Sequence, residues 1–326
     1  MASIFEGLTQ LLSPSVTKDI GNAVGLKPDL VSKGLGVVGP LITTALASKT
    51  SDAGGITDVM QMLPNDGTTS LLDNLARLVG GGMGSELLDS VLGDGSGAIG
   101  SALDRSLCFK ASSLLPIAAP LVMGLISKVA QDKKLDPTGV ANLLSTEAAE
   151  FEKTGGATAR LVRDALATGR QAADIKSKFS PVQWESVRLA PVAAAHVVIM
   201  ADKSGVVGAA KEISAAASVI DDVKKNASPT SVLSLAFETE VSATELGKFA
   251  KGLTTEDSLQ TVREAIDLVE RNSPADAWVY RRFVGEVADR VANASREGGF
   301  LGIGGKLVSP PEQAALDQLH QAIGDR

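Results

Sequence analysis

Apolar residues recur along this chain at the spacing of one face of an α-helix. In the second half, for example, they stand at Trp184, Val187, Leu189, Val192 and Ala195. In the first half, shorter apolar segments alternate with glycine-rich turns. The pattern predicts an all-α protein with two Ala- and Gly-rich helical domains, each containing an internal pseudo-repeat.

Helix start and stop signals place the expected helices. Ser13 followed by Pro14 suits a helix start, because a serine oxygen caps free amides and proline is tolerated at the first position. Gly25 suits the matching end. Ser180 and Ser273 are each followed by proline and repeat the start signal. The expected helices cover residues 4–12, 13–23, 28–36, 40–47, 56–63, 70–78, 85–92, 114–126, 157–175, 206–223, 243–251, 255–269 and 273–294, with one more opening at Ser180 and mildly interrupted at Pro191, and a last one after Ser309.

A short internal repeat appears in the first half. Residues 39–42 (Gly-Pro-Leu-Ile) match residues 119–122 (Ala-Pro-Leu-Val), an offset of 80 residues (119 − 39). We expect Pro40 and Pro120 each to open a buried helix. The two helices would then occupy equivalent places in a pseudo-symmetric pair.

The chain divides best where charged residues and glycines replace the apolar pattern. Residues 151–158 include Gly155 and Gly156 and are typical of a linker. The sequence therefore predicts an N-terminal domain over 1–150 and a C-terminal domain over 159–326.

Four segments of the first half carry a family resemblance. They are Ala23–Pro28, Val38–Ile42, Gly80–Gly84 and Leu115–Val122, and their helical pattern and proline placement resemble the YidB-like bacterial domain family of unknown function. The resemblance covers about residues 8–150. It implies a small Gly- and Ala-rich helical domain and supplies no catalytic residues.

The second half resembles the TerB-like helical proteins of tellurite resistance. The cues are Leu189–Pro191 leading to Ala201–Asp202, and Glu297–Gly302 leading to Val308–Ser309. The resemblance covers roughly residues 157–326. It implies a helix–loop–helix unit that occurs twice.

Composition narrows the function. Hydrophobic residues make up 44% of the chain, aromatic residues 3%, and the net charge is −7. Because neither half is strongly basic, we expect no nucleic-acid partner. Cys108 is the single cysteine, so no intrachain disulfide forms, which fits a cytoplasmic protein. The start of the chain lacks the features of a secretory signal, and residues 114–126 are too short to span a bilayer, so we expect no transmembrane segment.

Several motifs have a functional and a structural interpretation. Residues 34–39 and 95–100 both read G-x-G-x-x-G, but each lies in helical patterning, so we attribute the glycines to packing and turns. His196 lacks metal ligands at helical spacing, and we expect it to be buried and hydrogen-bonded. Cys108 lies between apolar neighbours and is expected to be buried. Arg281 and its neighbours are interpreted as a salt-bridged helix face. We predict no catalytic, cofactor-binding or metal-binding residues and no cofactor.

One loop is unusually apolar for its glycine content, and we select it as an interaction surface: Gly298, Gly299, Phe300, Leu301, Gly302, Ile303, Gly304 and Gly305. Its three apolar side chains either pack onto their own domain or dock a partner. The resulting prediction is a non-enzymatic interaction or scaffold protein that contacts a protein partner or self-associates. The alternatives are a stress-related, tellurite-resistance-like accessory protein that binds metal or a membrane-associated partner, and an enzyme with an unfamiliar site.

Overall fold

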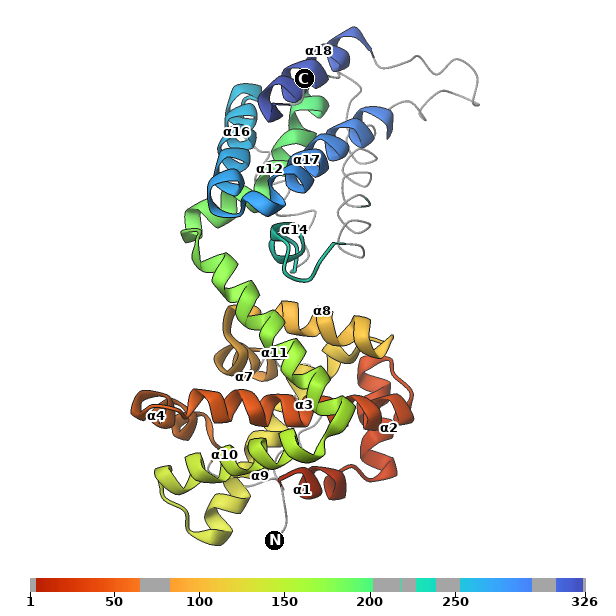
Figure 1. Cartoon of the computed structure of the whole chain (residues 1–326). Helices are drawn as coiled ribbons and strands as arrows, with labels where there is room; N and C mark the ends of the chain where they lie inside the picture. Colours follow the sequence, from red (N-terminus) through yellow and green to blue (C-terminus); the bar gives the residue numbers. More distant parts are fainter. Residues whose placement is uncertain are drawn as a thin grey trace. The chain divides into compact units, whose positions relative to one another are not determined.

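The computed structural model describes residues 4–64, 83–201, 218, 227–238, 253–294 and 309–324 (Figure 1). The described part contains helices and no strand, which confirms the all-α class. The chain separates into two compact units, residues 1–173 and 174–326. The division therefore lies later than the linker expected over 151–158. Helix α11 explains the difference, because it begins at Gly156 and runs on to Ser177 as one element.

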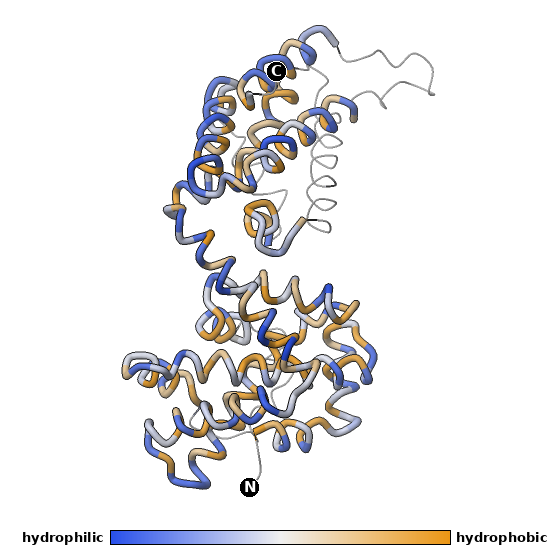
Figure 2. Tube along the Cα trace, in the orientation of Figure 1, coloured by the Kyte–Doolittle hydropathy of each residue, from blue (hydrophilic) through white to orange (hydrophobic). Residues whose placement is uncertain are grey.

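Unit 1 is built around two apolar helices. Helix α3 packs against α10, α9 packs against α7, and α3 and α9 contact each other. Hydrophobic positions recur along both central helices in Figure 2, and most of them are buried. The elements are α1 (Ile4–Leu11), α2 (Pro14–Val24), α3 (Pro28–Lys49), α4 (Ala53–Met62), α7 (Met83–Leu92), the short helix η1 (Gly93–Gly95), α8 (Ser96–Leu107), η2 (Ala111–Leu114), α9 (Leu115–Lys133), α10 (Pro137–Thr154) and the first part of α11 (Gly156–Ser177).

The two central helices are long and apolar enough to cross a bilayer. The segments are Pro28–Lys49, which is α3, and Ala111–Lys133, which is η2 together with α9. Residues 114–126 were expected to be too short to span a bilayer, but they belong to this longer second segment, so that expectation is wrong. Burial supports the core-helix interpretation instead, because 61% and 78% of their apolar windows lie inside the protein.

Pro40 and Pro120 do not open helices, contrary to the expectation. Pro40 lies in the middle of α3, which joins the two helices predicted over 28–36 and 40–47, and Pro120 lies inside α9. Both helices are buried as predicted. Their pseudo-symmetric equivalence stays a prediction.

Each internal proline leaves one carbonyl without its helical partner. Proline has no N–H, so the carbonyl four residues earlier loses its hydrogen bond. For Pro40 this is the carbonyl of Gly36, an exposed residue. For Pro120 it is the carbonyl of Pro116, which lies against Gly84 of α7 so closely that an added Cβ would collide with it. Both helices therefore continue through their proline with one helical hydrogen bond fewer.

Several local start and stop signals are confirmed. Ser13 accepts a hydrogen bond from the amide of Val16, and Gly25 ends α2 in the left-handed conformation with φ 71°. Ser309 and Glu312 form a reciprocal capping box at the start of the last helix. The helices predicted over 70–78 and 243–251 lie outside the described residues, and so does the helix predicted over 206–223 except for residue 218.

In unit 2, α12 packs against α16, α17 and α18, as Figure 1 shows for the upper group of helices. The described elements are the end of α11, α12 (Pro181–Ala201), α14 (Val232–Ala236), α16 (Thr255–Asn272), α17 (Pro274–Ala294) and α18 (Pro310–Ile323). The short helix α14 is fully buried. The adjoining Glu238 forms an ion pair of 2.6 Å with Lys176, and Arg188 donates to the carbonyl of Ala236 at 3.1 Å.

Helix α12 continues through Pro191, where a mild interruption was expected. The carbonyl freed by this proline belongs to Val187. It accepts a hydrogen bond of 2.6 Å from the hydroxyl of Tyr280, a completely buried residue of α17. Burial also raises the pKa of Tyr280, because the phenolate would be desolvated. A neighbouring helix therefore supplies the donor that proline cannot.

Candidate functional site

The predicted interaction loop, residues 298–305, lies outside the described residues. Both interpretations of the loop, packing onto its own domain and docking a partner, therefore stay predictions.

His196 is buried and hydrogen-bonded, as predicted. Its Nδ1 lies 2.9 Å from the Oγ of Ser258, which comes from α16 and is 62 positions away along the chain. His196 is 6% exposed and Ser258 0%, so the pair is buried. The pair joins α12 to α16 inside the core of unit 2. Sequence reasoning missed Ser258, because nothing local marks a serine as the partner of a distant histidine.

We expect the stability of unit 2 to fall in mild acid. Burial lowers the pKa of His196 from 6.5, since the charged imidazolium loses its hydration. The unfolded chain therefore binds a proton more readily than the folded one, and stability is full above pH 6.5 and decreases as the pH falls through the lowered folded value. Both tryptophans lie in unit 2, so denaturant unfolding followed by tryptophan fluorescence between about pH 8 and pH 5 reports on it.

Two variants separate the contribution of His196 from that of the other histidine. His196→Gln keeps a polar partner for Ser258 but does not titrate, and it should flatten the decrease. His320 lies 3.7 Å from Asp289 at the surface, and His320→Gln should leave the decrease in place. A decrease that survives in His196→Gln would assign the effect to other groups.

Cys108 is exposed, so the expectation of a buried thiol is wrong. The residue follows the last turn of α8 in the left-handed conformation, with φ 59°. This turn directs the chain away from the helix and leaves the Cys108 side chain outside the core. Its neighbours Leu107 and Phe109, by contrast, pack against the core. Apolar neighbours in sequence were therefore a poor guide to the burial of a residue that ends a helix.

Both G-x-G-x-x-G segments serve packing and turns, as predicted. The first lies within the continuous helix α3, and the second runs from η1 into α8. A side chain at Gly34 would collide with Leu114, and one at Gly39 would collide with Leu8. No strand precedes either segment among the described residues, so neither has the context that binds a dinucleotide.

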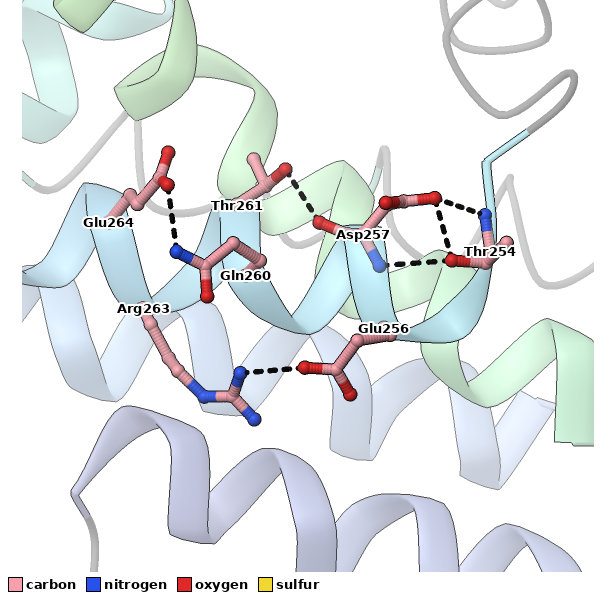
Figure 3. A network of polar contacts seen from close by, with 7 residues as sticks. All are labelled: Thr254, Glu256, Asp257, Gln260, Thr261, Arg263 and Glu264. Atoms are coloured by element: carbon pink, nitrogen blue, oxygen red, sulfur yellow. Dashed lines mark hydrogen bonds and ion pairs between the residues drawn. The ribbon is translucent and has the colours of Figure 1, made fainter.

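A polar groove of about 470 Å³ lies between α16 and α18. Glu256 and Arg263 of α16 pair at 3.0 Å across two helical turns, as Figure 3 shows. The same view shows Asp257 accepting hydrogen bonds from the hydroxyl and amide of Thr254, which lower the pKa of Asp257. The groove is also lined by Gln318, Gln321 and the buried Leu259. Within it, the charged groups neutralise each other, and the glutamines offer amide donors and acceptors.

Large apolar side chains are exposed at the starts of two packed helices of unit 2. Trp278 is 66% exposed and Val279 45% at the start of α17, and Val182 is 78% exposed at the start of α12. The guanidinium of Arg282 lies 5.5 Å from the centre of the Trp278 ring. The salt-bridged face expected here is present only in part, because Arg281 pairs with Glu270 while Arg282 stacks on tryptophan.

Among the described residues, no group of three or more His, Cys, Asp or Glu side chains is arranged to hold a metal ion. The two histidines of the chain have different partners: His196 is hydrogen-bonded to Ser258, and His320 lies beside Asp289.

Comparison with known proteins gives one match. Residues 6–129 match the model of a bacterial protein family of unknown function (DUF937). No curated protein and no solved structure shows a significant match to the chain. Nothing in these comparisons covers the C-terminal half, so its TerB-like resemblance stays a prediction. The N-terminal part of this chain, built around α3 and α9, is thus similar to a bacterial family whose function is unknown.

Proposed function

We propose that the protein is a non-enzymatic interaction protein that works through protein–protein contacts and associates with a second copy of itself. Three exposed apolar side chains carry the proposal: Trp278 and Val279 at the start of α17, and Val182 at the start of α12, the helix that packs against α17. They are called the Trp278 patch below. An exposed tryptophan is costly in water, and large apolar residues exposed together mark contact surfaces.

The composition of the Trp278 patch suits an interface. Tryptophan and arginine are the residues that most often dominate binding energy when they are buried against a partner. Arg282 lies over the face of the Trp278 ring, where the cation attracts the ring electrons and restricts the ring to fewer orientations. A preoriented anchor loses less conformational entropy on binding.

The two helices that carry the patch are fixed to each other. The buried hydrogen bond from Tyr280 to the Val187 carbonyl ties α17 to α12. Trp278 lies two residues before Tyr280, and Val182 lies five residues before Val187, which is about 7.5 Å along a helix. In a two-fold symmetric dimer the same patch occurs on both copies, so one apolar surface covers the other.

The proposal includes the YidB-like resemblance of the first half and the TerB-like resemblance of the second half. A YidB-like first half and a TerB-like second half would join two helical modules without catalytic residues, in a cytoplasmic protein. The apolar loop over 298–305 is a second surface for the same role, and its test replaces Phe300 and Leu301 by serine.

Replacing Trp278 by serine should weaken self-association about tenfold or more, because the anchor of the patch is lost. The thermal stability of the monomer should hardly change, since the side chain is exposed. Light scattering coupled to size-exclusion chromatography over a range of concentrations measures the first quantity, and circular dichroism the second.

Trp184 provides the matched control. Its ring packs edge-on against Phe179 at 5.3 Å between centroids, within unit 2. Trp184→Ser should therefore lower the thermal stability. A wild-type protein that stays monomeric at every concentration, or a Trp278→Ser variant that associates as strongly as wild type, would reject self-association through this patch.

A further inference from the structure

A small apolar pocket of about 180 Å³ lies in unit 1, among α3, α7, α8 and α11. Its walls include Val91, Ile99 and Leu166, which are nearly buried, and Ser48 and Arg170 at more exposed positions. The pocket lies entirely within residues 45–173. It belongs to neither the Trp278 patch nor the polar groove of unit 2.

The pocket results from how α11 lies on the unit. Leu166, Gly169, Arg170 and Ala173 recur at positions i, i+3, i+4 and i+7 and so share one face of α11. Gly169 has no side chain, and a Cβ there would collide with the side chain of Ile99. The bare glycine lets α11 approach α8 closely, while the flanking residues on that face border the pocket.

Arg170 gives the pocket its charge. Its side chain is exposed, and it forms no ion pair with any residue that the structure describes. The nearby Lys49 is already engaged, because its Nζ donates to the carbonyl of Ser90 at 2.5 Å. Among the residues lining the pocket, Arg170 is the one formal charge, and Ser48 adds a hydroxyl.

We propose that this pocket binds a short aliphatic carboxylate. The alkyl chain would lie against Val91, Ile99 and Leu166, and the carboxylate would accept hydrogen bonds from the Arg170 guanidinium, a donor whose fork matches a carboxylate. A cavity of roughly 150 Å³ accommodates benzene, so this pocket holds an alkyl chain of about five or six carbons. Hexanoate fits both requirements.

Hexanoate itself is the probe, and saturation-transfer NMR on the full-length protein measures its binding. With so few atoms, it should bind with a dissociation constant on the order of 1 mM. Hexan-1-ol has the same chain without the charge and should bind about tenfold more weakly.

Three variants test the two halves of the site. Arg170→Gln should weaken hexanoate binding about tenfold, because the charged hydrogen bonds are lost. Arg160→Gln makes the same charge change at another exposed position of α11 and should leave binding unchanged. Ala45→Leu adds a larger side chain to a residue that lines the pocket and should abolish binding.

Several results would overturn the proposal. One is the absence of hexanoate binding to the wild-type protein, and another is an equal loss in Arg170→Gln and Arg160→Gln. A third is binding that persists unchanged in Ala45→Leu while circular dichroism shows the variant to be folded. Binding only to anionic phospholipid vesicles, without binding of free hexanoate, would assign the surface to a membrane and equally overturn it.

Discussion

Replacing Tyr280 by phenylalanine should lower the free energy of unfolding of unit 2 by about 1–3 kcal/mol. The variant keeps the ring and its packing but removes the hydroxyl that donates to the carbonyl of Val187. That carbonyl has no helical partner, because the residue four positions later is Pro191. A buried carbonyl would then be left without any donor.

A double-mutant cycle with Pro191→Ala identifies the cause. Alanine restores an N–H that donates to the Val187 carbonyl, so Tyr280→Phe should cost about 1 kcal/mol less in the Pro191→Ala background than in wild type. Denaturant unfolding followed by tryptophan fluorescence provides all four values. Equal costs in both backgrounds would show that the hydroxyl acts independently of the proline.

Replacing Gly95 by alanine should destabilise unit 1 by about 1–3 kcal/mol. Gly95 has a negative φ, with φ −93° and ψ −1°, so it does not need the left-handed conformation that favours glycine. The added Cβ would instead collide with the main-chain atoms of Gly169 in α11. A main chain cannot rotate away as a side chain can, so α11 itself has to shift.

Gly36→Ala is the matched control. Gly36 lies in the interior of α3, and a Cβ there meets no atom within 4 Å. This variant should stabilise the protein by roughly 0.5–1 kcal/mol, because alanine is the better helix former. Unit 1 contains no tryptophan, so circular dichroism has to follow its unfolding. Similar effects of the two variants, in either direction, would contradict the close approach of Gly95 and Gly169.

The candidate surfaces were only weakly visible in the sequence. Trp278 and Arg282 lie four positions apart in the sequence, but nothing in the pattern says that this tryptophan is exposed while Tyr280, two residues later, is completely buried. The pocket of unit 1 was not predicted at all. It combines side chains of four helices, and no single stretch of sequence contains enough of them to suggest a ligand.

The sequence by itself determined the helical class and most helix ends. Signals such as Ser13 with Pro14, or Ser309 with Glu312, act within one turn, so their effect depends on neighbours along the chain. The same locality explains why the long helices predicted over 157–175, 255–269 and 273–294 lie close to where the structure has them.

Only the tertiary structure decided which local signals are overruled. Pro40 and Pro120 suggested helix starts, yet the helices continue through both. Cys108 turned outward, and His196 found Ser258 on another helix. For Pro191 and His196 the deciding groups are distant in sequence: the phenol hydroxyl of Tyr280 and the hydroxyl of Ser258. Their free-energy contributions exist only once the helices are packed, so no pattern along the chain contains them.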